Sequence, residues 1–337
     1  MKYSDLSIII CAQFAATPDV AYLILGKPGG GKSALAMDIV AKMGGTPANT
    51  VVFTPSLRDP VDVLGTPKND GVVTKWIPPE EFYKLRDDGT DEPKFLIIEE
   101  LTDASVSMMN AMCRIVHDRC AGDLQLSKQL YIISTGNRTE DKSGANRLTT
   151  KLGNRLNVQE FDENLDDWVE WAMDRDIDPV LIQFLRFKPN LLSDFDPARP
   201  YGINPTPRSW EKVALSPTTL STAHFFANIK GLVGEGAAAE YASFRKIYAS
   251  LVSFEDVVMS PTTVKIPLDL SAQYAIVGSV SHNTTMANVE RVAQFIERLP
   301  TDFGVMFWQD TIKKTPAVKA TKAFIRWATQ SGNVVLN

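Results

Sequence analysis

The chain has 337 residues, of which 44% are hydrophobic and 22% charged, a composition that supplies a buried core and excludes a wholly disordered protein. Lys and Arg number 35 against 40 Asp and Glu, so a net charge of −5 excludes a general basic surface for nucleic acid or anionic lipid. No apolar run reaches the roughly 18 to 20 residues that span a bilayer. We therefore expect a soluble protein with no membrane partner, in which nucleic acid would need a local basic groove.

The first apolar segment, Leu6–Ala16, has two interpretations. With Lys2 before it and small residues at its end, it resembles a secretory signal peptide, although Asp5 lies where that peptide should be basic. The favoured interpretation is an amphipathic helix capped by Ser4 or Asp5. Four apolar side chains would share its buried face, namely Leu6, Ile9, Ile10 and Phe14.

The cysteines indicate the compartment. Three cysteines, Cys11, Cys113 and Cys120, are too few and too odd in number for a disulfide framework, so we expect a reducing, cytoplasmic environment. Cys113, His117 and Cys120 would lie on one helical face and could be read as metal ligands. No fourth ligand is evident, and buried packing is the favoured interpretation of the two cysteines.

Residues 20–160 alternate short β-rich runs with helical patterns, which is typical of a parallel sheet with crossover helices. Strands are expected at Ala21–Leu25, Thr50–Thr54, Phe95–Ile98, Leu130–Ser134 and Asn157–Glu160. Helices are expected between them at Lys32–Met43, Pro79–Leu85 and Ser105–Arg119. The predicted fold class is therefore α/β, with a parallel sheet flanked by helices over residues 1–160.

From Asp162 onward the pattern becomes helical. Asp162 is expected to cap a helix, and Pro179 to open another after Asp178. A proline-rich loop, Pro189–Pro207, interrupts this region before helical patterns resume. We therefore expect an all-helical lid over residues 161–250 and a helical C-terminal extension over 251–337.

The strongest motif is the segment Gly26–Ser33, which fits the pattern G-x-x-x-x-G-K-[ST] between a strand and a helix. Its backbone N–H groups would surround the phosphates of ATP, Lys32 would reach the β- and γ-phosphates, and the Ser33 hydroxyl would ligate Mg²⁺. The predicted nucleotide-binding residues are Gly26, Pro28, Gly29, Gly30, Gly31, Lys32 and Ser33.

Polar side chains follow two strands that we place next to each other. Glu99 and Glu100 come directly after the apolar run Phe95–Ile98, at the edge of the sheet where a nucleotide's phosphates would lie. Glu99 is assigned to the Mg²⁺ shell and Glu100 to the base that accepts the proton of the attacking water. Asn137 follows the strand Leu130–Ser134, and its amide can orient that water.

These motifs, in this order, resemble those of the AAA+ ATPases, and within them the MoxR-type branch. The resemblance covers residues 1 to about 250 and includes two arginine motifs. It implies that Arg155 is an arginine finger entering the neighbouring subunit's site, and that Arg208, on the helical lid, is a second sensor of the γ-phosphate. MoxR-type proteins usually carry Asp-Glu where this chain has Glu99-Glu100, which leaves the rate of hydrolysis in question.

Two insertions point to the same branch. Residues 62–67 lead into a glycine turn at Asn69–Gly71, and Pro67–Pro78 is expected to form a hairpin facing the pore of a ring, with Lys75 and Trp76 toward a substrate. Packing of Trp76 onto its own domain is the other interpretation. A second hairpin is expected at Asp123–Gln129.

The resemblance implies an Mg²⁺-dependent ATPase that forms a homo-oligomeric ring, a hexamer, and acts as a chaperone that remodels a protein client. A von Willebrand factor A domain protein is the partner it suggests. Two alternatives stay open: a DNA-translocating or replication-associated motor, made less favourable by the acidic charge, and a nucleotide switch that assembles a scaffold with little turnover.

Overall fold

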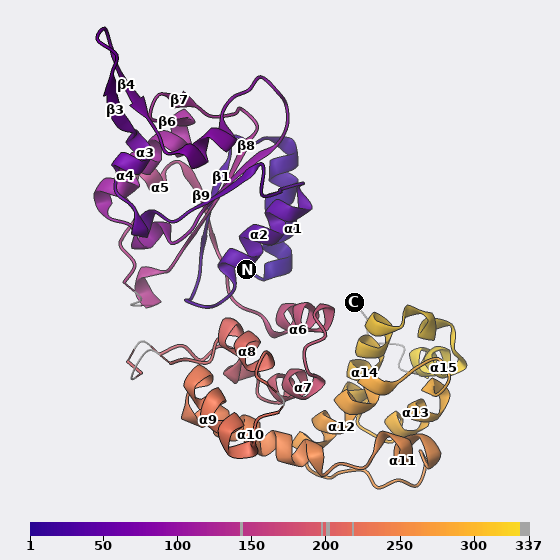
Figure 1. Ribbon diagram of the computed structural model, residues 1–337. Helices are drawn as coiled ribbons and strands as arrows, with labels where there is room; N and C mark the ends of the chain where they lie inside the picture. The colour runs from indigo at the N-terminus through magenta and orange to yellow at the C-terminus, as the bar shows by residue number, and fades with distance from the viewer. Residues whose placement is uncertain (142–143, 197, 200–202, 218, 331–337) are drawn as a thin grey trace. The chain divides into compact units, whose positions relative to one another are not determined.

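The structure is a computed structural model that describes residues 1–141, 144–196, 198–199, 203–217 and 219–330. Its contacts divide the chain into two units (Figure 1). The first includes Met1–Asp167 and the short segment Thr206–Arg208, and the second includes Trp168–Asp194 and the helices from Ser209 onward. No helix among the described residues combines the length and the apolar character needed to cross a bilayer.

A five-stranded parallel sheet in the order β2-β5-β8-β1-β9 forms the centre of the first unit. The strands are β1 (Ala21–Leu25), β2 (Thr50–Phe53), β5 (Lys94–Ile98), β8 (Leu130–Gly136) and β9 (Leu156–Glu160). Their apolar runs are continuous because both faces are covered. Leu96 and Ile98 of β5 belong to one core and Phe95 and Ile97 to the other.

Helices cover both faces of this sheet. On one face, α1 (Tyr3–Ala16) and α2 (Lys32–Lys42) bury a row of apolar side chains that includes Leu6, Ile10 and Leu35. On the other face, α4 (Val106–Asp118) contributes Met108, Met112 and further side chains to the second core. Shorter pieces complete this face: η1 (Pro55–Leu57), α3 (Val61–Leu64), η2 (Glu80–Leu85), η3 (Leu101–Asp103) and α5 (Thr150–Gly153). Another short turn, η4 (Thr139–Asp141), follows β8.

Two hairpins leave this body. The longer one pairs β3 (Thr66–Asn69) with β4 (Thr74–Ile77), and every residue of both strands is exposed (Figure 1). The shorter one pairs β6 (Cys120–Ala121) with β7 (Leu124–Gln125). Backbone bonds connect the two hairpins, because Asp123 N–H donates to the Trp76 carbonyl oxygen at 2.8 Å.

The second unit is helical throughout its described residues. Two of its α-helices, α6 (Leu165–Asp174) and α8 (Pro207–Ala214), begin in the first unit. The other elements are α7 (Pro179–Phe187), α9 (Thr222–Val233), α10 (Glu235–Ala249), α11 (Phe254–Met259), α12 (Leu270–Asn283), α13 (Val289–Ile296), α14 (Thr301–Lys314) and α15 (Lys322–Gln330), with 3-10 turns η5 (Pro189–Leu191) and η7 (Pro316–Ala320). Phe184 of α7 packs against the rings of Trp210 and Tyr241. Arg186 is joined to Asp310 by two short hydrogen bonds of 2.6 and 2.7 Å.

The predicted strands and the α/β fold are confirmed, and several local predictions are wrong. Pro79–Leu85 is not an α-helix but a 3-10 helix over Glu80–Leu85, whose first turn is closed by a bond from Phe82 N–H to the Pro79 carbonyl. The second hairpin spans Cys120–Gln125 and not Asp123–Gln129, because the positive φ of Gly122 sets its turn earlier in the chain.

The two predicted helix caps at the ends of the sheet domain also differ. Asp162 does not cap α6. It is ion-paired with Arg138 at 2.6 Å, and Asn164 caps the helix instead by accepting from Asp166 N–H. Helix α1 begins at Tyr3, before both predicted caps, and Tyr3 N–H donates to the carboxylate of Asp167. Ile9 was predicted on the buried face of α1 but is 41% exposed. The buried residues 6, 10 and 14 are spaced by four, and this row turns away from position 9 as it follows the helix.

Candidate functional site

The loop Gly26–Ser33 follows β1 and leads into α2. Gly29 and Gly31 adopt positive φ values of +74° and +107°, which residues with a Cβ rarely adopt. A Cβ at Gly26 would lie 2.6 Å from the carbonyl oxygen of Phe161, so the loop needs glycine there as well. Since α2 begins at Lys32, the N–H groups of its first turn lack intrahelical partners and are available to an anion.

Lys32 is the buried cation of this loop. Its side chain is 9% exposed, and its Nζ donates to the carbonyl oxygens of Gly26 and Lys27 at 2.7 Å each and to Asn137 Oδ1 at 3.0 Å. Burial lowers the pKa of Lys32 to about 8. The structure thus brings the loop lysine and the predicted sensor amide into direct contact.

The two carboxylates lie at the end of β5, which is the neighbour of β8 in the sheet. Glu99 N–H donates to Phe53 O at 2.8 Å and continues the sheet by one residue. Glu100 then turns sharply, with a φ of +54° that is uncommon outside glycine. Its Oε2 accepts a 2.9 Å hydrogen bond from Ser56 Oγ.

Asn137 follows β8 and is held at three points. Its backbone N–H donates to Thr102 Oγ1 at 2.8 Å, and its Nδ2 donates to Asp103 Oδ2 at 3.2 Å. Its Oδ1 accepts from Lys32. Loop lysine, sensor amide and the residues after Glu100 therefore form one hydrogen-bonded edge at the carboxyl ends of the strands.

Arg208 also lies near the loop. Within the first unit, its backbone N–H donates to the Gly29 carbonyl at 3.3 Å, and its charge lowers the pKa of Lys32. Thr206 covers Gly29, because a Cβ on that glycine would lie 2.8 Å from the threonine hydroxyl oxygen. The structure therefore places the backbone of Arg208 beside the loop, and its role as a second sensor stays a prediction.

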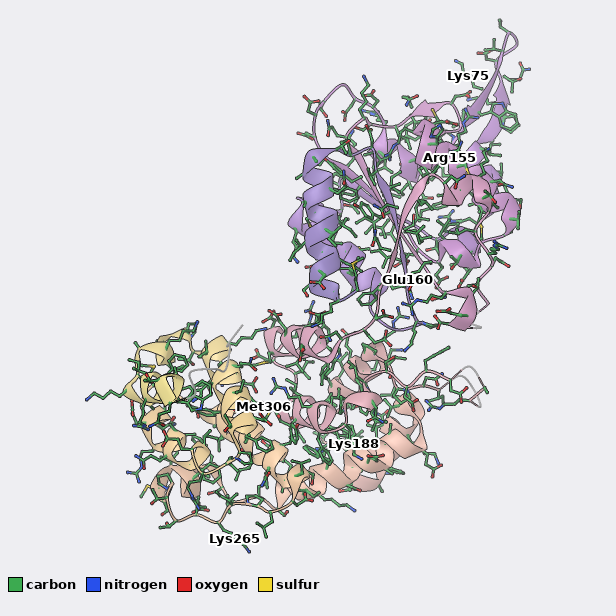
Figure 2. The ribbon with its side chains drawn as sticks, turned by 180° about the vertical axis from the view of Figure 1, so that it is seen from behind. Lys75, Arg155, Glu160, Lys188, Lys265 and Met306 are labelled. Carbon is green, nitrogen blue, oxygen red and sulfur yellow. The ribbon has the colours of Figure 1, made fainter. Side chains whose placement is uncertain are left out.

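Arg155 is not part of this edge. The strand register pairs Ala21 with Leu156 and Leu25 with Glu160, so Arg155 lies where β1 begins and the phosphate loop where β1 ends. Figure 2 shows Arg155 and Glu160 apart, at the two ends of β9. Arg155 Nη1 donates to the Lys151 carbonyl at 2.6 Å, beside an open hollow of about 540 Å³ that Arg119 and His117 also line.

Four residues near the loop were missed from the sequence. Ser56 donates a hydrogen bond to Glu100, and Asp103 accepts one from Asn137. Glu163 forms an ion pair with Lys27 at 3.3 Å. Arg138 donates to the carbonyl of Phe161 at 2.9 Å and so ties the loop after β8 to the loop after β9. Asp103 could have been found, because it lies only three residues beyond Glu100 at the same strand end.

The residues present fit a nucleoside triphosphate and Mg²⁺. The buried ammonium group of Lys32 donates to two carbonyl oxygens and one amide oxygen. Phosphate oxygens can replace these acceptors. The Ser33 hydroxyl and the Glu99 carboxylate offer hard oxygen atoms of the kind that Mg²⁺ prefers. Among the described residues, no three His, Cys, Asp or Glu side chains are grouped as a metal site.

A comparison with family models finds a match that includes this loop. Residues 21–156 match the family model described as AAA domain (dynein-related subfamily). No curated protein matches the chain. Similar solved structures include NtrX from Brucella abortus, with 16% identity, 90% of this chain and 67% of that chain covered, and a TM-score of 0.37.

Two further similar structures come from Thermotoga maritima. One is a DNA polymerase III gamma subunit-related protein, 8% identical over 91% of this chain and 83% of that chain, with a TM-score of 0.35. The other is a mutant of RuvB, 13% identical over 76% of this chain and 79% of that chain, with a TM-score of 0.40.

Proposed function

We propose that this protein hydrolyses ATP with Mg²⁺ as a ring of identical subunits, a hexamer in the cytoplasm, because residues 21–156 match the family model of an AAA domain. We further propose, from the resemblance to the MoxR-type branch, that the ring remodels or activates a protein partner, with a von Willebrand factor A domain protein as the candidate.

The observation that supports hydrolysis is the convergence of Lys32, Asn137 and Glu100 at neighbouring strand ends. In the proposed reaction, Lys32 exchanges its backbone acceptors for phosphate oxygens. Glu100 accepts the proton of the attacking water, and Asn137 orients that water. Ser33 and Glu99 would hold Mg²⁺, which when bound offsets the negative charge of the phosphates.

The position of Arg155 supports a ring. The phosphate loop and Arg155 lie at opposite ends of β1, a strand of five residues, about 13 Å apart along its length. Arg155 therefore serves the nucleotide of another subunit rather than its own. In the proposed assembly, its guanidinium offsets charge that develops on the phosphoryl group of that neighbour.

The exposed hairpin of β3 and β4 supports a protein client. Val72 at its tip is 90% exposed, and Trp76 is 45% exposed, which disfavours the interpretation of Trp76 as a packing residue. Lys68 and Lys75 lie opposite each other across the two strands (Figure 2 labels Lys75). Apolar side chains kept in water at the end of a projecting element mark an interaction site.

A nucleotide switch with little turnover is the second candidate. The hydrogen bond from Ser56 Oγ to Glu100 Oε2 favours it, because it occupies one oxygen of the carboxylate proposed as the base. The two candidates differ in turnover, so they are separated by a rate measurement.

The test is ATP hydrolysis by the whole chain, with and without a candidate partner and with and without duplex DNA. Glu100→Gln should retain ATP binding and lose about a hundredfold in turnover, the scale of general-base assistance. Glu92→Gln is the matched control, since Glu92 is exposed in the loop before β5. Equal turnover of Glu100→Gln and the wild type would remove Glu100 from the role of base, and stimulation by DNA alone would favour a DNA motor.

A further inference from the structure

Asp103 is a carboxylate in the nucleotide site to which no role has yet been given. It ends η3, three residues after Glu100, and it is half-buried. Burial raises the pKa of Asp103, the charge of Glu100 also raises it, and the charge of Lys32 lowers it. Asp103 is therefore within electrostatic reach of both the predicted base and the loop lysine.

The hydrogen bonds of Asp103 form a closed ring with Thr102 and Asn137. Thr102 Oγ1 donates to Asp103 Oδ1 at 3.3 Å and accepts from Asn137 N–H at 2.8 Å. Asn137 Nδ2 then donates to Asp103 Oδ2 at 3.2 Å, which closes the ring. Thr102 is 3% exposed, so water competes little for its hydroxyl.

This ring determines which end of the Asn137 amide faces the nucleotide site. An ionised carboxylate only accepts hydrogen bonds, so the side of the amide toward Asp103 must be the NH₂ group. The amide oxygen must then face Lys32, from which it accepts at 3.0 Å. Lys32 only donates and therefore favours the same orientation. Once Lys32 turns to the phosphates, the Asp103 carboxylate is the contact that still keeps the NH₂ group on its side.

We propose that Asp103 is a positioning residue for the hydrolysis reaction. It holds the Asn137 amide so that the carbonyl oxygen, and not the NH₂ group, faces the reacting centre. When Lys32 turns to the phosphates, that oxygen becomes free to accept a hydrogen bond from the attacking water, whose proton goes to Glu100, while Asp103 continues to accept the hydrogen bond of Nδ2. This inference rests on the proposed ATPase function.

Asp103→Asn tests the proposal with little change in volume. The replacement amide can both donate and accept, so it no longer selects one orientation of Asn137. We expect kcat to fall about tenfold, with KM for ATP and the melting temperature unchanged, as for an interaction needed only in the transition state. Asp91→Asn is the matched control, because Asp91 is exposed and carries the same chemical change.

A double-mutant cycle separates positioning from an independent role. If Asp103 acts through Asn137, then Asp103→Asn combined with Asn137→Ala should be no slower than Asn137→Ala alone. Losses that add would overturn the proposal and make Asp103 a separate participant, and an unchanged kcat in Asp103→Asn would overturn it too. Should Asp103→Asn fold poorly, Asp103→Glu keeps the charge and should retain more turnover than Asp103→Ala. Turnover of the wild type reports on the ATPase function itself, whereas the ratios between variants report on Asp103.

Discussion

Lys32 has a depressed pKa because its ammonium group is removed from water before any phosphate is present to receive it. Its three acceptors in the structure are neutral oxygens, which compensate the charge only in part. Bound phosphates would raise this pKa again, since an opposite charge favours the protonated form. Nucleotide binding is therefore coupled to protonation of Lys32.

The sign of this coupling predicts the pH dependence of affinity. Below the free-state pKa of about 8, Lys32 is already protonated and affinity is at its maximum; above it, binding must take up a proton and weakens with rising pH. Between pH 7.5 and 9, the Kd of an ATP analogue without Mg²⁺ should rise roughly tenfold, measured by titration calorimetry. Lys32→Arg should show no such rise, because guanidinium stays protonated over this range. A flat wild-type profile would contradict the coupling.

Residues in continuous motifs were predictable, and residues joined only by folding were not. Lys32, Glu100 and Asn137 stand at fixed places relative to strands, so the order of β5 and β8 was enough to bring them together. Ser56 is 44 residues from Glu100 in the chain, and no local pattern relates the two. The role of each predicted residue remains a proposal.

Among the elements, the strands of the parallel sheet were predicted closely. A strand that is buried on both faces needs a continuous apolar run, and such a run can be recognised in the sequence. The missed details were decided by tertiary partners. The carboxylate of Asp162 could cap a helix, but it forms an ion pair with Arg138. Asn164 caps α6 instead. The hairpin of β3 and β4 was predictable because Gly71, with a φ of +96°, defines a turn that the sequence pattern already contains.

Gly122 gives a prediction for the hairpin base. A Cβ at Gly122 would lie 2.4 Å from the Trp76 carbonyl oxygen, and its φ of +54° disfavours any side chain. Gly122→Ala should therefore destabilise the protein by about 2 kcal/mol, seen in thermal unfolding. Gly71→Ala shares the positive φ but meets no close atom of the described chain, so it should cost less, about 1 kcal/mol. Equal losses would mean that the contact with Trp76 contributes nothing.

Trp76 gives a prediction for the exposed part of the same hairpin. With 45% of its surface in water, Trp76→Ala should cost about 1 kcal/mol or less, far below the 3 to 5 kcal/mol of a core aromatic. The basal ATPase rate should persist while stimulation by a partner is lost. Tyr83→Ala, at 41% exposure on η2, is the control and should keep stimulation. A large drop in melting temperature with all rates falling together would contradict a gripping role for Trp76.

For the whole molecule, the separation of Arg155 from its own phosphate loop predicts complementation between subunits. Lys32→Ala and Arg155→Ala should each be nearly inactive alone. An equal mixture should regain about a quarter of wild-type turnover, because random assembly pairs an intact loop with an intact finger at one interface in four. Light scattering with a non-hydrolysable ATP analogue should show the assembly itself. A mixture no faster than its components would place Arg155 outside the shared site.

Helix α4 connects the end of the sheet near Asp103 to the bases of the two hairpins. Helix α4 spans 13 residues, about 20 Å, and begins three residues after Asp103. At its other end, Arg114 donates to the Gly122 carbonyl at 2.8 Å, and Gly122 in turn contacts the base of the longer hairpin. The buried face of α4 leaves it no freedom to bend independently of its neighbours. A tilt of α4 at its end near Asp103 would therefore be transmitted through Arg114 and Gly122 to the bases of both hairpins.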